Sequence, residues 1–177
     1  MYLVTSSVYV HFAHHVRGHA GPCISLHGHT WKLEVILQAR ELDAAGFVVD
    51  FDVIKERLLD PCHALLDHSL AVGPETWGES KTELERLGHT LVASREAFPG
   101  TVGQPPPVLS GELGGARNER PGGIKVAVFP FSPTSEQLAC WLHGVSNDLI
   151  GDDRVSAACG RIYEALHPTE LIAEYRP

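Results

Sequence analysis

Two histidines and a cysteine in the segment 23–29 have a spacing that could support metal-assisted chemistry. His27 and His29 are two residues apart, so on a β-strand both imidazoles point to the same face. Cys23 lies four residues before His27 and has the same parity. Catalytic zinc sites typically have three protein ligands and one open position. The segment therefore predicts a metalloenzyme with a reactive thiol, provided that a third ligand lies nearby.

The predicted third ligand is His14, at the end of an earlier strand over residues 8–16. In this strand Val8, Val10 and Phe12 precede His14 on the more apolar face, which we expect to face the core. If residues 8–16 pair antiparallel with the strand that begins at His27, His14 comes to lie near His29. His15 is the rival ligand, but it falls on the mixed face and is expected to point away.

Length and composition predict one globular domain over residues 1–177. An apolar content of 44% and a charged content of 20% are ordinary for such a domain. The net charge of −8 argues against nucleic-acid binding. Neither a membrane-spanning run nor a signal-peptide pattern is present, and the four cysteines show no paired spacing, so we expect a cytoplasmic protein with reduced thiols and no membrane partner.

The pattern of elements is α+β, in the order ββααββ. Besides the first two strands, it predicts a helix after Phe51 that kinks or restarts at Pro61, and a helix with the capping box Thr134–Gln137. These elements predict a four-stranded antiparallel sheet with two helices on one face. An exposed insertion is predicted at about 73–123, with a short helix from Thr82 to about Phe98. The further predicted strands cover residues 124–131, 155–164 and 171–175.

Several short motifs together resemble the 6-carboxytetrahydropterin synthase and 6-pyruvoyl-tetrahydropterin synthase family. They occur in the family's order over residues 8–72 and 124–176. The motifs are Phe12-Ala-His14, Cys23-Ile-Ser-Leu-His27-Gly-His29, the Gly46-to-Phe51 segment ending Asp50-Phe51, Leu66-Asp67-His68, Pro133-Thr134-Ser135-Glu136 and Ile162-Tyr163-Glu164.

The resemblance implies the tunnelling fold, an active site between subunits, and a homo-oligomer that is typically a hexamer built from trimers. It also implies a role for each residue of the motifs that could take part in chemistry. These roles are Zn²⁺ ligation by His14, His27 and His29, proton transfer by Cys23 with Asp67 and His68 as the partner dyad, and anchoring of the pterin ring by Glu164.

The gap between cysteine and histidines is similar to that of the bacterial carboxytetrahydropterin branch. That branch implies a zinc-dependent carbon–carbon lyase acting on 7,8-dihydroneopterin triphosphate in 7-deazapurine (queuosine-type) biosynthesis. Its product is 6-carboxy-5,6,7,8-tetrahydropterin, formed with acetaldehyde and triphosphate. The chain departs from the family where Ala165 stands in place of a common threonine, and in its long insertion.

The residues also allow other roles. Cys23 could be a zinc ligand of a closed structural site, Asp67 and His68 could cap a helix end, and Glu164 could be a solvated surface charge. Two other functions remain open: a 6-pyruvoyl-type triphosphate elimination, and a non-catalytic pterin-binding protein with structural zinc. The cations considered for the triphosphate are Arg17, Lys32, Lys125 and Arg161.

Overall fold

The computed structural model describes residues 1–93, 105–166 and 168–177. The chain divides into two compact units. The first unit comprises Met1–His11, His29–His63 and Thr134–Pro177, and the second comprises Phe12–Gly28 and Ala64–Pro133. The division falls inside the first two strands of the chain, between His11 and Phe12 and between Gly28 and His29.

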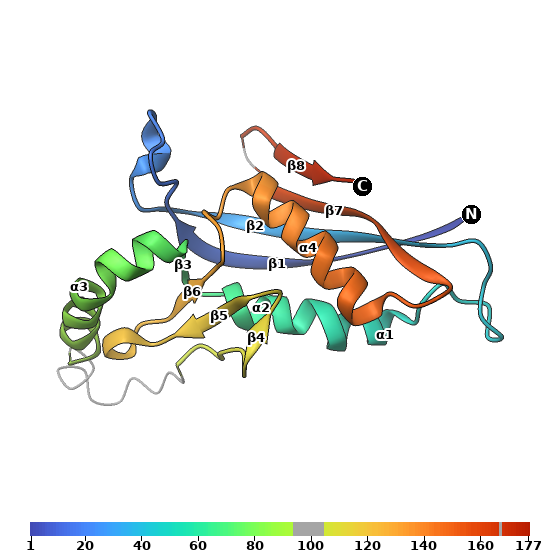
Figure 1. Ribbon diagram of the computed structural model, residues 1–177, viewed down its shortest axis with the longest axis horizontal. Coiled ribbons are helices and arrows are strands. Elements are labelled where there is room, and N and C mark those ends of the chain that lie inside the picture. The colour runs from blue at the N-terminus through green and yellow to red at the C-terminus, as the bar shows by residue number, and fades with distance from the viewer. Residues whose placement is uncertain (94–104, 167) are drawn as a thin grey trace. The chain divides into compact units, whose positions relative to one another are not determined.

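The first unit is built on long strands. They are β1 (Tyr2–His14), β2 (His27–Ala39), β7 (Val155–Ala165) and β8 (Leu171–Tyr175), and β7 pairs antiparallel with both β2 and β8 (Figure 1). Trp31, Leu33 and Val35 alternate along β2 and are buried, as expected for the core face of a strand. The predicted strands 155–164 and 171–175 are confirmed within a residue.

Helix α4 (Ser135–Ile150) packs along β7 in the first unit (Figure 1). Its predicted capping is confirmed, since the Thr134 side chain accepts a hydrogen bond from the amide of Gln137. A β-carbon at Gly160 of β7 would lie 2.3 Å from the carbonyl oxygen of Ala139, so glycine there permits the close approach of helix and strand.

The helix after Phe51 consists of α1 (Phe51–Ile54), a π-helical turn over Lys55–Leu59, and α2 (Asp60–Leu66). Pro61 near the start of α2 has no amide proton and excludes the regular hydrogen bond to the preceding turn. The widened turn lies directly before this proline, in agreement with the predicted kink or restart.

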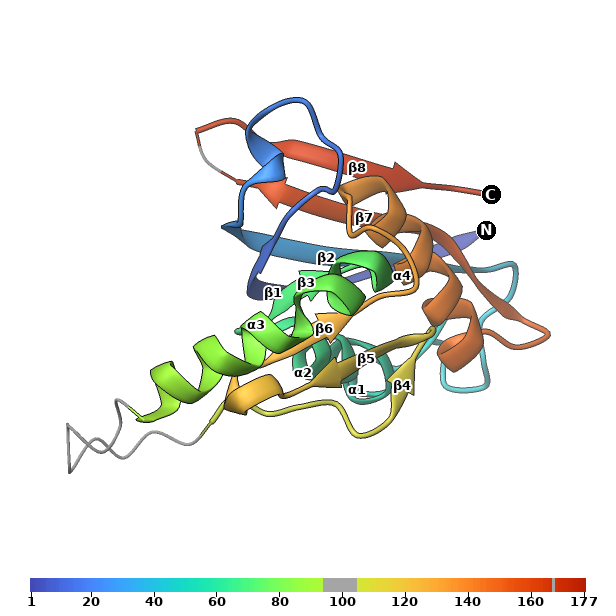
Figure 2. The same cartoon turned by 60° about the vertical axis from the view of Figure 1, so that its left-hand side comes forward.

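The second unit contains shorter strands around the end of β1. They are β3 (Leu70–Val72), β4 (Glu112–Leu113), β5 (Ala116–Glu119) and β6 (Val126–Val128). β3 pairs parallel with β1 and with β6, whereas β5 pairs antiparallel with β4 and β6 (Figure 2). A 3₁₀ turn over Pro22–Ile24 carries Cys23, and another spans Pro121–Gly123.

The described part of the insertion contains one long helix besides strands β4 and β5. Helix α3 (Pro74–Ala93) begins before Thr82, so the start predicted there is wrong; Gly73-Pro74 is the true helix start, with proline at a first-turn position. Its predicted end near Phe98 lies outside the described residues. α3 packs through Trp77 and Leu84 against Val72, Val126 and Val128.

The prediction of four strands is wrong, because hydrogen bonds link eight in the order β4-β5-β6-β3-β1-β2-β7-β8. Strand β6 lies inside the predicted strand 124–131, whereas β3, β4 and β5 have two to four residues each, too few for alternation to be recognised. Two of the pairings are parallel, so the sheet is not purely antiparallel. None of the described helices is both long enough and apolar enough to cross a membrane. The single domain over residues 1–177 stays a prediction.

Candidate metal and acid–base site

His14 and His27 face each other where β1 ends and β2 begins, both in the second unit. Their Nε2 atoms are 3.2 Å apart and their ring centroids 4.6 Å apart. His14 is only 1% exposed, and it follows Val10 and Phe12 on the buried face of β1 as its parity predicts. The two strands therefore bring imidazole nitrogens together at their shared end.

The second nitrogen of each ring is held by a backbone carbonyl. His14 Nδ1 lies 2.9 Å from the carbonyl oxygen of Pro133, and His27 Nδ1 lies 2.8 Å from that of Ser25. A carbonyl oxygen only accepts, so Nδ1 carries the proton in both rings and donates it.

This arrangement fits a metal ion. In the neutral rings both Nε2 atoms then carry lone pairs, and at 3.2 Å these repel each other unless a cation or a shared proton lies between them. Histidines that bind metals typically donate their other N–H to a carbonyl or carboxylate, which orients the ring. The hydrogen bonds to Pro133 and Ser25 have this form.

His29 and Glu164 lie together in the first unit. His29 Nε2 is 3.7 Å from Glu164 Oε1, and both side chains are about a quarter exposed or less. Glu164 Oε2 accepts a short hydrogen bond from Ser135 Oγ, in the first turn of α4. Ser135 stands in the helix-start motif Pro133-Thr134-Ser135-Glu136, and its contact with the distant Glu164 has no local sequence signal.

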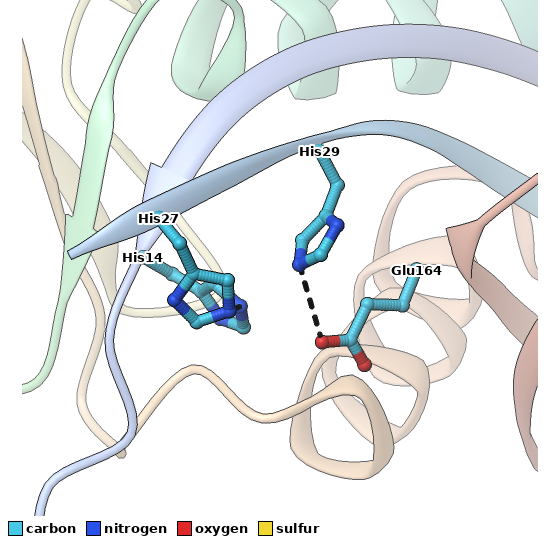
Figure 3. A group of neighbouring side chains, drawn as sticks. All are labelled: His14, His27, His29 and Glu164. Atoms are coloured by element: carbon cyan, nitrogen blue, oxygen red, sulfur yellow. Dashed lines mark hydrogen bonds and ion pairs between the residues drawn. The ribbon is translucent and has the colours of Figure 1, made fainter. Parts of the chain in front are cut away.

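The metal-ligating atoms of His14, His27, His29 and Glu164 all lie within 4.8 Å of one another (Figure 3). His27 and His29 share one face of β2 because a single residue separates them. That residue, Gly28, allows β2 to approach β1 closely, since a β-carbon there would lie 3.3 Å from the carbonyl oxygen of Phe12. The four side chains form a group that could hold a metal ion.

Cys23 is half-buried in the turn Pro22–Ile24 and has a free thiol. The carbonyl oxygen of Cys23 accepts from the amide of Val16 at 2.7 Å, which closes the loop between β1 and β2. Cys23 is not a member of the four-residue group, so the geometry gives no support to a closed site that includes this thiol.

His15 and Arg17 attach the same loop to α3. His15 Nε2 lies 2.9 Å from Thr76 Oγ1, and both Nη atoms of Arg17 donate to Glu79, at 2.6 and 2.9 Å. Burial lowers the pKa of the His15 imidazole. His15 is thus engaged with α3, in agreement with the expectation that it points away from the other histidines.

The cations considered for the triphosphate already have partners in this chain. Arg17 pairs with Glu79, Lys32 pairs with Glu34, and Arg161 pairs with Glu34 and Glu174. Lys125 is buried and donates to backbone carbonyls. Of the four, Arg17 has the most exposed side chain, at 47%.

Asp67 and His68, directly after α2, are in contact. Asp67 Oδ2 lies 2.7 Å from His68 Nδ1; the side chain of Asp67 is 11% exposed and that of His68 is 68% exposed. A carboxylate only accepts, so Nδ1 donates and Nε2 is left free to exchange a proton. Neighbouring residues thus form the pair, even though sequence neighbours often point apart.

The backbone of His68 lies in the left-handed region. Its φ is +55°, and among the described residues it is the only non-glycine with positive φ. Such a conformation costs an L-residue about 1–2 kcal/mol relative to glycine. It turns the chain from α2 into β3 and directs the imidazole to its position beside Asp67.

We therefore expect His68→Gly to be more stable than His68→Ala by about 1 kcal/mol, since both remove the imidazole but only glycine adopts positive φ without strain. Urea unfolding of the two variants measures this difference. Equal free energies of unfolding would show that the backbone relaxes at this position.

Comparison of the sequence with known proteins finds a matching family. A family model described as 6-pyruvoyl tetrahydropterin synthase matches residues 4–176. The 6-carboxy-5,6,7,8-tetrahydropterin synthase of Rickettsia bellii is 40% identical over 57 residues, which are 32% of this chain and 41% of that protein. The chain thus spans about two fifths of the length of this relative, and other matched relatives carry the same name.

Solved structures with the same fold cover nearly all of the chain. An uncharacterized protein from Wolinella succinogenes has a TM-score of 0.68 at 22% identity, with 99% of this chain and 97% of that one covered. The 6-pyruvoyltetrahydropterin synthase of Plasmodium vivax has a TM-score of 0.53 at 14% identity, with both chains fully covered. At these identities the likeness concerns the fold.

Proposed function

Because the chain belongs to the 6-pyruvoyl tetrahydropterin synthase family and has its α+β tunnelling fold, we propose that it is a zinc-dependent pterin lyase. The proposed reaction converts 7,8-dihydroneopterin triphosphate and water to 6-carboxy-5,6,7,8-tetrahydropterin, acetaldehyde and triphosphate, in a 7-deazapurine (queuosine-type) pathway. The carboxy product is favoured by the names of the matched relatives and by the short spacing from Cys23 to His27.

One observation supports the metal above all others. His14 and His27 present Nε2 lone pairs to each other at 3.2 Å while carbonyl oxygens fix both Nδ1 protons. With His29 they make the three-imidazole donor set that is common in catalytic zinc sites. When bound, zinc supplies a Lewis acid that stabilises negative charge developing on oxygens of the substrate side chain.

Cys23 is the proposed base that removes a proton from that side chain. It lies in the loop between the strands that carry His14 and His27, it is free, and it is half-buried. A thiolate next to a cationic centre is a competent base, because positive charge favours the deprotonated form. Its loop is attached to α3 by the Arg17–Glu79 pair and the His15–Thr76 contact.

The Asp67–His68 pair is the proposed second proton carrier. The Asp67 carboxylate fixes the proton on Nδ1, so Nε2 of His68 can take up and return protons. The imidazole is 68% exposed in the single chain. This exposure is consistent with an active site completed by another subunit, and we propose a homo-oligomer built from trimers.

Glu164 is the proposed anchor of the pterin ring. A carboxylate accepts two parallel N–H bonds from the edge of a pterin, which matches both shape and charge. Ser135 Oγ donates to Oε2 and so orients the carboxylate. Glu164 is also close enough to the histidines to serve as a fourth metal ligand, and its substitution separates these roles.

The product assay tests the proposed function. Zinc-loaded protein incubated with 7,8-dihydroneopterin triphosphate is expected to release acetaldehyde and 6-carboxy-5,6,7,8-tetrahydropterin in equal amounts, as measured by chromatography and an alcohol dehydrogenase-coupled assay. A pyruvoyl product without acetaldehyde would replace the proposal by triphosphate elimination. Tight pterin binding without turnover would leave only the binding protein.

A further inference from the structure

The end of helix α2 is held by side chains from a distant part of the chain. An α-helix leaves its last carbonyl groups without partners inside the helix, and buried ones must find others. Here Ser69 donates to the Leu66 carbonyl through both its amide and its hydroxyl, at 3.0 and 2.6 Å. The carbonyls of Ala64, Leu65 and Asp67 accept instead from Asn118 of strand β5 and from Lys125, which lies directly before β6.

Lys125, directly before β6, provides two of these contacts. Its Nζ donates to the carbonyl oxygens of Ala64 at 2.6 Å and Asp67 at 2.8 Å, and the residue is only 5% exposed. Burial lowers the pKa of the Lys125 ammonium to about 8, the nearby Asp67 carboxylate acting in the opposite direction. Burying an ammonium costs free energy even at a helix C-terminus, where cations are favoured, so its position there indicates a structural role.

Asn118 of β5 provides the third contact. Its Nδ2 donates to the carbonyl oxygen of Leu65 at 2.8 Å, while its Oδ1 accepts from the amide of Leu109 at 2.7 Å. Both side-chain atoms are thus used, and the residue joins two segments of the insertion to the end of α2. Asn118 belongs to the insertion, and Lys125 lies just after it.

The residues that follow α2 depend on this support. His68 is held at φ +55°, and strained conformations of this kind persist only where the surroundings fix them. The backbone carbonyl of Asp67, bonded to Lys125, belongs to the residue whose carboxylate pairs with His68. Lys125 also contacts the chain beyond the Asp67–His68 pair, because its own backbone carbonyl accepts a hydrogen bond from the amide of Leu70 at 3.1 Å.

We propose that Lys125 and Asn118 are positioning residues that hold the Asp67–His68 pair, and that presenting Asn118 is a function of the insertion. The inference rests on the proposed function in so far as the pair carries protons. Neither residue needs to touch the substrate. Loss of either is expected to change the placement of His68 and so the turnover number, with substrate affinity and metal content preserved.

Lys125→Met is the main test, with Lys81→Met as the matched control because Lys81 is an exposed lysine on α3 of the same unit. We expect Lys125→Met to lower kcat about 10-fold or more, because small displacements of catalytic groups have large effects on rate. KM and zinc content are expected to stay at parent values, and Lys125→Arg is expected to recover part of kcat. Lys81→Met should match the parent.

A spectroscopic readout makes the test independent of turnover. In the parent, ¹⁵N NMR of the neutral His68 ring, assigned with His68→Gln, should show the proton on Nδ1, as the contact with Asp67 requires. Lys125→Met should shift the ring towards the Nε2–H tautomer that free histidine favours. If the parent fails the product assay, this shift still supports the positioning role while the proposed function falls.

Asn118→Asp is the second variant, since it removes the amide that donates to Leu65 and, more weakly, to Val126, and it keeps the acceptor for Leu109. If Lys125→Met does not fold, Asn118→Asp tests the positioning role in its place. The same loss of kcat and the same change of tautomer, in smaller degree, are expected. Folded variants with parent kcat and the parent tautomer, whatever their melting temperatures, would overturn the proposal.

Discussion

Cys23→Ala is expected to lose at least about 100-fold in the rate of acetaldehyde release, the range in which general acid–base catalysis contributes. Alanine removes the thiol and leaves the turn Pro22–Ile24 intact, because the carbonyl oxygen of Cys23, rather than its side chain, bonds to Val16. Zinc content and KM should therefore remain at parent values. Steady-state kinetics together with metal analysis measure all three quantities.

Cys140→Ala is the matched control, since Cys140 is a free, exposed cysteine on α4. It is expected to retain full activity. If Cys23→Ala also turned over at the parent rate, the thiol would have no part in catalysis. If it lost zinc in proportion to activity, Cys23 would be a ligand, as in the alternative of a closed structural site.

The second large effect is expected at the histidines. His14→Ala and His27→Ala should each purify with little zinc and without detectable turnover, because two remaining imidazoles hold the ion far more weakly than three. His11→Ala is the control: His11 is an exposed histidine on β1 whose Nδ1 contacts Thr30. It should bind zinc like the parent, as measured by atomic emission and by competition with a chelator.

Glu164→Gln separates two roles of the carboxylate within the same experiment. If Glu164 anchors the pterin, the amide variant keeps its zinc and shows a raised KM, because one acceptor of the paired N–H bonds becomes a donor. If Glu164 is a metal ligand, zinc affinity falls instead. Full zinc content in His14→Ala would contradict the proposed centre whatever the result at Glu164.

Local patterns predict well which histidines of the candidate group share a face of a strand. Side chains alternate along a strand, so the parity of His14 with Val10 and Phe12, and of His27 with His29, indicates one common face. The cap at Thr134 is equally local, since a hydroxyl three residues before an amide is recognisable in the sequence. Each of these features depends on neighbours within a few residues, and each is found as predicted.

Contacts between distant segments could not be predicted in this way. Lys125 was considered for the triphosphate only because it is a cation, yet its ammonium is buried against carbonyls of Ala64 and Asp67, although lysine is mostly exposed in proteins. Ser135 has a sufficient local explanation as a residue of a helix start, which hid its contact with Glu164. Strand β3 has three residues, and its pairing with β1 and β6 comes from the tertiary fold.

The three residues Pro133–Ser135 contact both a ligand of the proposed metal site and the proposed pterin anchor. The carbonyl of Pro133 orients the His14 ring, and the hydroxyl of Ser135 orients the Glu164 carboxylate. A substitution that displaces this tripeptide is therefore expected to alter the dissociation constants of the proposed zinc ion and of the proposed pterin substrate together. A change near Ser25 is expected to affect the proposed metal site without affecting Glu164. Among the contacts described, the Ser25 carbonyl orients only His27.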